Sequence, residues 1–248
     1  MTAVLRLDGV SVRYGGTAAL TGVDLTVGAG ERVALVGPSG AGKSTLLGLV
    51  NGSVSPSSGS LQVLGADPSR LRGPALRRLR ARVGTVHQHL ELVGQLRVVH
   101  NVNAGRLADW SAARAAWSLV RPQGVPEVLD ALSAVGLADR AYERTERLSG
   151  GQRQRVAVAR LLVQHPELVL ADEPASALDP VLADSVLGLL AALATEQGGA
   201  LVASLHDPTL ALRHCTRVVG LVDGRVVLDA PAERLTVGDL AEFYGAPR

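Results

Sequence analysis

The sequence predicts an α/β fold in which buried, parallel strands end in polar residues, and three observations support this prediction. The apolar run RVALVG at 32–37 leads into the glycine-rich motif GPSGAGKST. The run LVLA at 168–171 ends in an acidic pair, and LVASL at 201–205 is followed by a histidine. Ligands of parallel sheets bind in the crevice at the carboxyl ends of the strands. We therefore expect these polar residues to face one crevice.

The N-terminal part predicts short antiparallel strands. LRLDGVSVRY at 5–14 and TGVDLTVGAG at 21–30 alternate apolar and polar residues, which is the period of a half-buried strand, and glycine-rich turns separate them. After the glycine-rich motif, STLLGLV at 44–50 predicts a helix. The shorter piece GSLQVLG at 59–65 is expected to be hairpin-like.

The middle of the chain is predicted to be helical. An arginine-rich segment at 69–84 precedes the strand VGTVHQ at 83–88, and the pattern beyond Gln88 is helical to about Leu162. The cluster from Arg70 to Arg82 is interpreted as a solvated helix face, with contact to lipid headgroups or a partner as the alternative.

The C-terminal part returns to strands. ELVLADEP at 167–174 and GALVASLHD at 199–207 predict buried strands. RVVGLVDGRVVLDA at 217–230 predicts a closing hairpin, because Asp-Gly is a favoured two-residue turn.

Composition bounds the class of protein. Of the 248 residues, 47% are hydrophobic, which suits one elaborated domain with a substantial core. The formal net charge is only +2, so nucleic acid is not implied as a partner. The longest apolar run, 185–194, is too short to span a membrane, and the N-terminus is no signal peptide, so we expect a cytosolic chain. Cys215 is the only cysteine, which excludes an internal disulfide and fits a reducing compartment.

Lysine usage singles out one position. All 25 lysine and arginine residues except Lys43 are arginine, and isoleucine is absent, which indicates a G+C-rich, bacterial genome. A loop of backbone N–H groups around a triphosphate has room for a compact ammonium but not for a planar guanidinium. The lone lysine therefore favours a nucleotide-binding loop over a glycine-rich turn that holds a lysine by chance.

The motif and the strand ends suit phosphate chemistry. Gly37 and Gly42 permit backbone conformations that direct N–H groups at the phosphates, and the Ser44 hydroxyl can ligate Mg²⁺. Asp172 can also hold Mg²⁺, and Glu173 can orient and polarise the attacking water. An acidic pair usually caps a solvated turn, but the apolar run before this one argues for a site.

The histidine after the third strand is the least specific of these signals. A lone histidine is more often structural. At a strand end, however, His206 is expected to donate a hydrogen bond to the γ-phosphate.

Together these motifs resemble the ATP-binding subunits of ABC transporters, over essentially the whole chain. In order, they match the phosphate loop, the glutamine loop, the signature LSGGQ, the Mg²⁺-binding strand, the aspartate loop and the switch histidine of that family. The resemblance implies the catalytic residues Glu173, His206, Gln88 and Lys43, and the metal ligands Ser44, Gln88 and Asp172. It implies nucleotide contacts from Tyr14, Gly37, Pro38, Ser39, Gly40, Ala41, Gly42, Lys43, Ser44, Thr45, Ser149, Gly150, Gly151, Gln152 and Asp179.

Tyr14 matches the aromatic residue that stacks on adenine in the family. Such stacking is made by the ring face and needs no particular hydrogen bond. The alternative is a half-buried strand tyrosine without a ligand.

The resemblance also implies the fold and its division. We expect one ABC ATP-binding domain over 1–248, with a P-loop NTPase (RecA-like) core, an antiparallel β-subdomain and a helical signature subdomain. The core with the β-subdomain is expected at 1–88 and 163–230, the helical subdomain at 89–162 and a C-terminal segment at 231–248.

The signature, LSGGQRQ at 148–154, has the glycines and serine of a phosphate-binding helix start but no lysine. In the family two subunits pair head to tail, and the signature of one closes over the γ-phosphate held by the other. The implied cofactors are ATP and Mg²⁺. The implied partners are a second copy, integral-membrane permease subunits and, indirectly, a solute-binding protein, at the cytoplasmic face of a bacterial membrane.

Segments between the motifs resemble, more narrowly, the ATP-binding subunits of phosphonate importers. The expected function is energy coupling in an importer for phosphonates or a related oxyanion, and import of another small polar solute, such as an amino acid, is the alternative. A soluble ABC ATPase acting on DNA or ribosomes usually carries a coiled-coil arm, a zinc hook or a second ATPase domain, and none is visible here. A metabolite kinase or GTPase would leave the signature without a purpose.

Two features depart from simple expectations. Histidines flank Gln88, which leaves open how the surface that couples to the permease is built. Trp110 and Trp117 are seven residues apart and are expected to share a helix face, more often in a core than on a surface that grips the membrane subunit.

Overall fold

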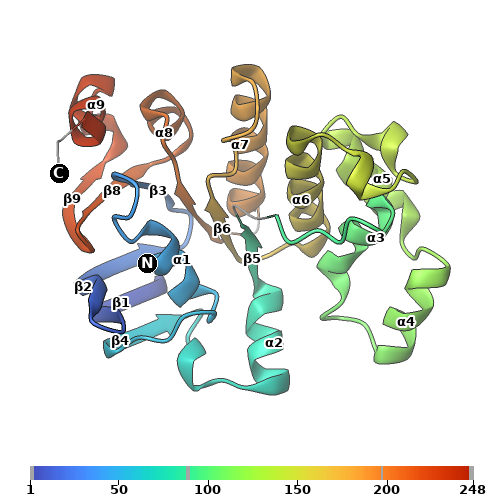
Figure 1. Cartoon of the computed structure of the whole chain (residues 1–248), viewed down its shortest axis with the longest axis horizontal. Coiled ribbons are helices and arrows are strands. Elements are labelled where there is room, and N and C mark those ends of the chain that lie inside the picture. Colours follow the sequence, from blue (N-terminus) through green and yellow to red (C-terminus); the bar gives the residue numbers. More distant parts are fainter. Residues whose placement is uncertain (1–2, 88–89, 197, 246–248) are drawn as a thin grey trace.

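The structure is a computed structural model that describes residues 3–87, 90–196 and 198–245 (Figure 1). Within these ranges six strands form the larger sheet, in the order β5-β6-β7-β3-β8-β9. Neighbouring strands are parallel, except that β9 is antiparallel to β8. The predicted α/β class is therefore confirmed. The strands are β3 (Arg32–Val36), β5 (Val83–Val86), β6 (Leu168–Asp172), β7 (Ala200–Ser204), β8 (Arg217–Val222) and β9 (Arg225–Pro231).

Successive side chains along the strands of the larger sheet pack into two different hydrophobic cores. Val33 and Leu35 of β3 pack into a core that includes helix α1 (Lys43–Val50), whereas Ala34 and Val36 pack into the core that includes helix α7 (Pro180–Glu196). Successive side chains of a strand point to opposite faces, so a sheet covered on both faces needs continuous apolar runs. The remaining helices of this part are α2 (Gly73–Arg82), α8 (Pro208–His214) and α9 (Val237–Gly245).

A second, antiparallel sheet has the order β2-β1-β4, with β1 (Ala3–Tyr14), β2 (Thr17–Gly28) and β4 (Ser58–Val63). The piece expected to be hairpin-like at 59–65 is the third strand of that sheet. It pairs Leu61 with Leu7 of β1 and ends in a tight turn in which Val63 pairs with Ala66. The pairing with β1 follows from packing. Leu61 and Leu7 are both buried in the core beneath the sheet, and an isolated hairpin has no such core to enter.

Helices of the segment between β5 and β6 form one end of the molecule (Figure 1). They are α3 (Val98–Asn103), α4 (Ala112–Val120), α5 (Val125–Ala134) and α6 (Gly150–Gln164). α3 and α5 pack against α6, and all three contribute to the α7-side core. Short 3₁₀ turns complete the chain at Pro68–Arg70, Ala104–Arg106, Ala138–Arg140, Thr145–Arg147 and Ala232–Arg234.

The two tryptophans do not share a helix face, so that expectation is wrong. Ser111 caps α4 by accepting a hydrogen bond from the N–H of Arg114, which places Trp110 before the helix begins. The Arg114 guanidinium lies over the Trp110 ring, 4.9 Å from its centre. Trp117 is 55% exposed, so it is not a core residue either.

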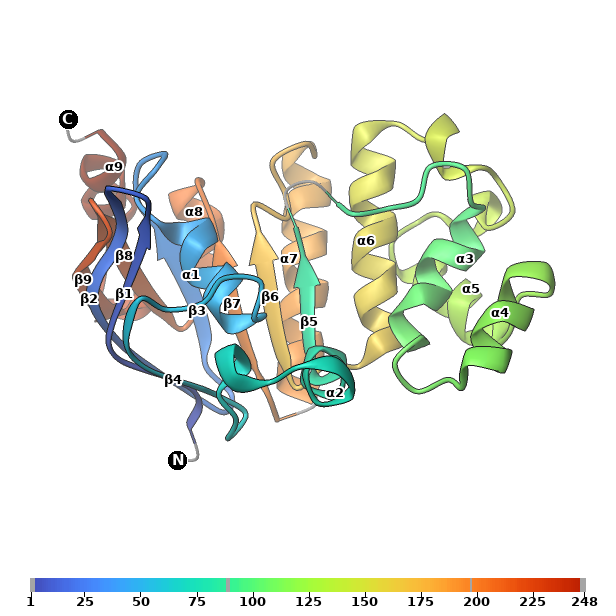
Figure 2. The ribbon, with the colours of Figure 1, turned by 60° about the horizontal axis from the view of Figure 1, so that its bottom comes forward.

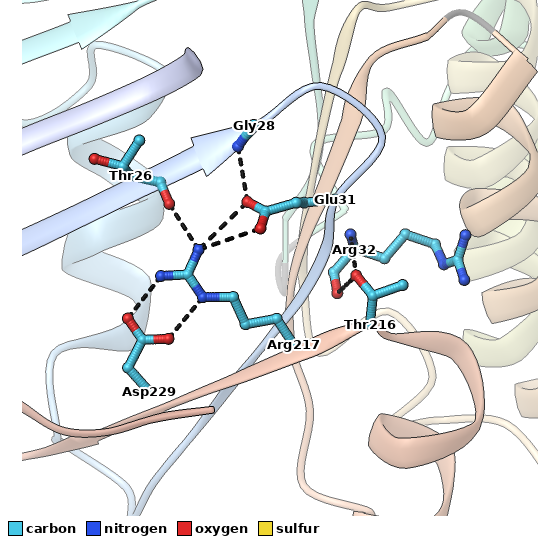
Figure 3. Close-up of polar contacts among 7 residues, drawn as sticks. All are labelled: Thr26, Gly28, Glu31, Arg32, Thr216, Arg217 and Asp229. Carbon is cyan, nitrogen blue, oxygen red and sulfur yellow. Dashed lines mark hydrogen bonds and ion pairs between the residues drawn. The ribbon is translucent and has the colours of Figure 1, made fainter. Parts of the chain in front are cut away.

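One arginine connects the two sheets (Figure 3). The Arg217 guanidinium of β8 donates two hydrogen bonds of 2.6 Å to the Asp229 carboxylate and one of 2.8 Å to the carbonyl of Thr26 on β2. Its Nη1 also lies 3.3 Å from the Glu31 carboxylate, which accepts from the Gly28 N–H. The hydrogen bonds to Asp229 raise the pKa of Arg217 above its ordinary value. This network fixes β2 against the edge of the larger sheet.

No helix in the described part of the chain combines the length and apolar character that a bilayer-spanning segment requires.

Candidate functional site

The phosphate loop, 37–42, connects β3 to α1 and needs glycine where it leaves the strand. Gly37 has φ 145°, and a Cβ there would lie 2.1 Å from the carbonyl oxygen of Leu221 on β8. Within the loop, the Ala41 N–H donates to the Pro38 carbonyl, and Ser39 and Gly40 lie between them. α1 then begins at Lys43, and Ser44 and Thr45 form its first turn.

Lys43 is held inside this loop. Its ammonium donates hydrogen bonds to the carbonyls of Gly37, at 2.7 Å, and Pro38, at 3.0 Å, and the residue is only 6% exposed. Desolvation by burial lowers the pKa of Lys43, and the charges of Glu173 and Asp172 oppose that shift. The two carboxylates therefore lie close enough to help keep the lysine charged.

The acidic pair lies at the end of β6, beside the end of β7. The buried Ser204 hydroxyl donates to Asp172 Oδ1 at 2.6 Å and accepts from the Glu173 N–H at 2.9 Å. His206 Nε2 lies 2.6 Å from Glu173 Oε1. The structure thus brings together Asp172, Glu173 and His206, as the strand-end argument expects.

Glu173 adopts an uncommon backbone conformation. Its φ is +51°, in the left-handed region, which costs a non-glycine residue of order 1–3 kcal/mol. The conformation is held from both sides, since the Glu173 carbonyl accepts from the Gln154 amide at 3.0 Å and from the Ser176 hydroxyl at 3.1 Å. A residue held in a strained conformation beside a phosphate loop is a candidate for catalysis.

Two cavities adjoin the phosphate loop and the acidic pair. One of about 250 Å³ is lined by Tyr14, Ser44, Thr45 and Asp172, together with residues of α1 and β5. The other, of about 200 Å³, is lined by Glu173, Ser176, Ser204, His206 and neighbouring residues. Tyr14 is 55% exposed at the end of β1, so its ring is open to a ligand.

The signature begins helix α6. Ser149 and Gln152 form a capping box, in which the Ser149 hydroxyl accepts from the Gln152 N–H and the Gln152 side chain accepts from the Ser149 N–H. Gly150 and Gly151 form the first turn. Asp179 caps α7 by accepting from the N–H groups of Val181 and Leu182.

The signature and the phosphate loop of one chain do not face each other. Figures 1 and 2 both show α1 and α6 on opposite sides of β5 and β6. The structure therefore assembles Tyr14, the phosphate loop, Asp172, Glu173 and His206 but leaves the Ser149 end of α6 apart. Gln88, the predicted ligand of the glutamine loop, lies outside the described residues.

Sequence reasoning missed two residues of this site. Ser204 forms hydrogen bonds with both Asp172 and Glu173. In the sequence it looks like an ordinary residue near the end of an apolar strand. Gln154 reads as one more polar residue of a helix, yet it is 3% exposed and bonded to the Glu173 carbonyl. A signal existed only for Ser204, which lies at a strand end two residues before His206.

Comparison with known proteins gives one family. Residues 20–176 match the profile of the family described as "ABC transporter". The chain is 50% identical over 242 residues to the phosphonates import ATP-binding protein PhnC of Pseudomonas putida, which covers 98% of this chain and 90% of that protein. It is 48% identical to the phosphonates import ATP-binding protein PhnC of Pseudomonas entomophila, over 97% of this chain and 91% of that protein.

Solved structures show the same architecture. The dimeric structure of MJ0796, a bacterial ABC transporter cassette, is 31% identical, with a TM-score of 0.82 over 92% of this chain and 98% of that chain. A dimeric post-hydrolysis state of the same cassette, bound to ADP and Pi, is 30% identical with a TM-score of 0.79.

Proposed function

The chain belongs to the ABC transporter family, and on this premise we propose that it hydrolyses ATP to drive import of phosphonates or a related oxyanion. The observation that carries the ATPase role is the assembly of Lys43, Asp172 and Glu173 at one end of the parallel sheet. The solute rests on the 50% identity to a phosphonate import protein along nearly the whole chain.

The chain's own groups suit attack of water on the γ-phosphorus. The Glu173 carboxylate orients a water and accepts its proton as the new P–O bond forms and the bond to the leaving ADP oxygen breaks. Lys43 exchanges its loop carbonyls for the β- and γ-phosphate oxygens and neutralises their charge. His206, beside the Glu173 carboxylate, donates to the γ-phosphate.

The donor set fits Mg²⁺. The Ser44 hydroxyl and the Asp172 carboxylate line the same 250 Å³ cavity, and hard oxygen ligands of this kind suit Mg²⁺ when phosphates complete its coordination. Gln88 is the third ligand that we propose. When bound, Mg²⁺ would supply positive charge that offsets the negative charge on the phosphates.

We further propose that the working unit contains two chains paired head to tail. The Ser149 end of α6, with Gly150, Gly151 and Gln152, would close over the γ-phosphate bound by the partner chain. The separation of α6 from its own phosphate loop supports this arrangement, as does the dimeric state of the related cassette. The Asp179 loop, which packs against the start of α6, would lie at the same interface.

For the membrane permease, the most suitable surface is a groove of about 710 Å³ beside α2, β5 and the start of the helical end. His87, Glu91 and Arg160 line it. Arg160 donates to the carbonyls of Leu90 and Glu91, so the groove borders the chain that follows Gln88. We place the chain at the cytoplasmic face of the membrane, with 89–162 as the helical subdomain, 1–88 and 163–230 as the core and 231–248 as the C-terminal segment.

Two substitutions test the ATPase assignment. Glu173→Gln is expected to bind ATP but hydrolyse it roughly a hundredfold more slowly, on the scale of a lost general base. Lys43→Ala is expected to lose binding as well, because its ammonium neutralises the phosphates. Phosphate release and the affinity for a fluorescent ATP analogue measure the two effects. Near-normal turnover in Glu173→Gln would overturn the assignment.

A further inference from the structure

A single buried amide joins the signature helix to the catalytic glutamate of the same chain. Gln154 of α6 is 3% exposed, and its Nε2 donates to the Glu173 carbonyl at 3.0 Å. The contact spans 19 residues of sequence and connects two elements that the proposed function assigns to different ATP sites. Ser149 would serve the partner's nucleotide, whereas Glu173 serves the chain's own.

Stability alone does not explain an amide at this position. Gln154 Oε1 is buried and has no hydrogen-bond partner within the part of the chain that the structure describes. A buried acceptor without a partner is unfavourable, and an apolar side chain of similar size would avoid it. We therefore attribute the presence of glutamine here to its side-chain NH₂ group, which donates to the Glu173 carbonyl.

The bond acts on a backbone that needs to be held. Glu173 has a left-handed φ of +51°, its N–H donates to the Ser204 hydroxyl, and its carbonyl receives Gln154 on one side and Ser176 on the other. The direction of the Glu173 side chain follows from the orientation of these two peptide groups. A shift of the carbonyl therefore re-aims the carboxylate that orients water.

Helix α6 can carry such a shift. Gln154 lies five residues after the cap Ser149, about 7.5 Å along the axis at 1.5 Å per residue, and the capping box orders the turns between them. A Cβ on Gly151 would lie 3.1 Å from Leu178 Cδ2 and 3.2 Å from the Ala177 carbonyl oxygen. The first turns of α6 thus rest directly on the loop that follows Glu173.

We propose that Gln154 is a positioning residue that couples the signature helix to Glu173. Closure of the Ser149 end over the partner's nucleotide moves α6, and Gln154 passes this movement to the Glu173 carbonyl. Hydrolysis in one site then depends on nucleotide in the other. This proposal rests on the proposed function, in which Glu173 acts in its own chain and Ser149 acts on the partner's nucleotide.

The test removes the donor and keeps the volume. Gln154→Met is expected to lower kcat roughly tenfold to a hundredfold, the scale of a small misplacement of a catalytic group. The KM and the affinity for a fluorescent ATP analogue stay within about twofold, because no phosphate contact is lost.

Gln164→Met is the matched control. The Gln164 amide lies on the same helix and also donates to backbone carbonyls, those of Arg80 and Ala81, but far from Glu173. All variants are assayed below their melting temperatures. The kcat of Gln164→Met is expected to stay within about twofold of the wild-type value. An equal loss of kcat in both variants would show that Gln154 acts only on the stability of α6 and would overturn the proposal.

A double substitution separates this proposal from the function on which it rests. If Gln154 acts through Glu173, Gln154→Met adds nothing to the loss already caused by Glu173→Gln, so the two effects are not multiplicative. Multiplicative losses would contradict the coupling. Normal kcat in Gln154→Met with slow hydrolysis in Glu173→Gln would overturn the inference and leave the ATPase role intact. Near-normal hydrolysis in Glu173→Gln itself would overturn the function.

Discussion

At the scale of single residues, one hydroxyl organises the acidic pair. Ser204 donates to the Asp172 carboxylate and accepts from the Glu173 N–H, and it is fully buried. A hydroxyl can do both at once because it is one donor and two acceptors. It therefore fixes the spacing between Asp172 and Glu173, to which we assign metal binding and water orientation.

Ser204→Ala is expected to reduce kcat roughly tenfold, because the Glu173 backbone loses one of its anchors. The unpaired Glu173 N–H also destabilises the fold by about 1–3 kcal/mol. Steady-state hydrolysis and thermal unfolding measure the two effects. Ser118→Ala is the control, since Ser118 is also buried and bonded, but to the Ala115 carbonyl on α4. Unchanged kcat in Ser204→Ala, or an equal loss in the control, would count against this role.

Residue types revealed only part of the site. Lys43 was predictable from its glycine-rich motif, and Asp172, Glu173 and His206 from their positions at the ends of apolar strands. Ser204 and Gln154 were not, because their function depends on burial and on partners 31 and 19 residues away. Nor does a sequence pattern show that Glu173 has a positive φ.

At the scale of elements, the β8–β9 turn supports the phosphate loop. Asp223 and Gly224 both have positive φ, as the predicted Asp-Gly turn requires. The Gly224 N–H donates to the Ala41 carbonyl of the phosphate loop at 3.1 Å, and its carbonyl accepts from the Thr21 N–H of β2 at 2.8 Å. The turn is thus fixed between the loop and the antiparallel sheet.

Gly224→Ala is expected to weaken ATP binding about fivefold or more, because its Cβ would lie 2.6 Å from the Ala19 carbonyl oxygen and displace the turn from the loop. Nucleotide titration measures the change. Gly65→Ala is the control, since Gly65 has a φ of +79° but no atom within 4 Å of an added Cβ. If both variants bind ATP equally well, the turn does not support the loop.

Helix α4 is an element with little to pack against. Of its nine residues only Ser118 is buried, and Trp117, Leu119 and Val120 are 55%, 57% and 78% exposed. Exposed apolar patches of this kind mark interaction sites. Because Ala104 and Gly105, in the 3₁₀ turn that precedes α4 in the chain, line the 710 Å³ groove, we propose that the patch belongs to the permease interface.

Trp117→Ser is expected to lower co-purification with the permease about tenfold, since exposed tryptophans at interfaces are often energetic anchors. ATP hydrolysis by the isolated chain stays unchanged, because α4 does not touch the site. Tyr142→Ser, at a residue 54% exposed outside this patch, is the control. Equal permease recovery for both variants and the wild type would exclude α4 from the interface.

Strands were predictable where the apolar pattern was strong, as in β1 and β6 to β8, whereas β2 begins at Thr17 rather than at the predicted Thr21. The pairing of 59–65 with β1 was not predicted, because β1 lies some 50 residues earlier and no local pattern reveals a partner at that distance. The tryptophan pair was predicted wrongly because Ser111 caps α4, so that Trp110 lies outside the helix despite its seven-residue spacing from Trp117.

At the scale of the whole molecule, we propose that each chain contributes two separate halves, one to each of two ATP sites. One half consists of Tyr14, the phosphate loop, Asp172, Glu173 and His206, and the other is the Ser149 end of α6. β5 and β6 lie between α1 and α6, so the phosphate loop and the Ser149 end of α6 stay apart within one chain (Figure 2). In the proposed twofold dimer both sites would be completed at once, since each half would meet its complement on the partner. The sequence led to this arrangement only through the family resemblance. No sequence pattern shows whether the N-terminus of a helix contacts the nucleotide of its own chain or that of a partner.

The most direct test of this composite site mixes two inactive chains. One carries Lys43→Ala and the other Ser149→Arg, and they are purified as forced heterodimers. In the mixed dimer one site combines an intact phosphate loop with an intact signature, whereas the other site contains both lesions. Phosphate release is compared with that of each homodimer at equal total protein. The account predicts activity well above the mean of the two homodimers, although below the wild type, because only one site binds ATP normally. Activity no higher than that mean would show that the signature serves its own chain's nucleotide and would contradict the account.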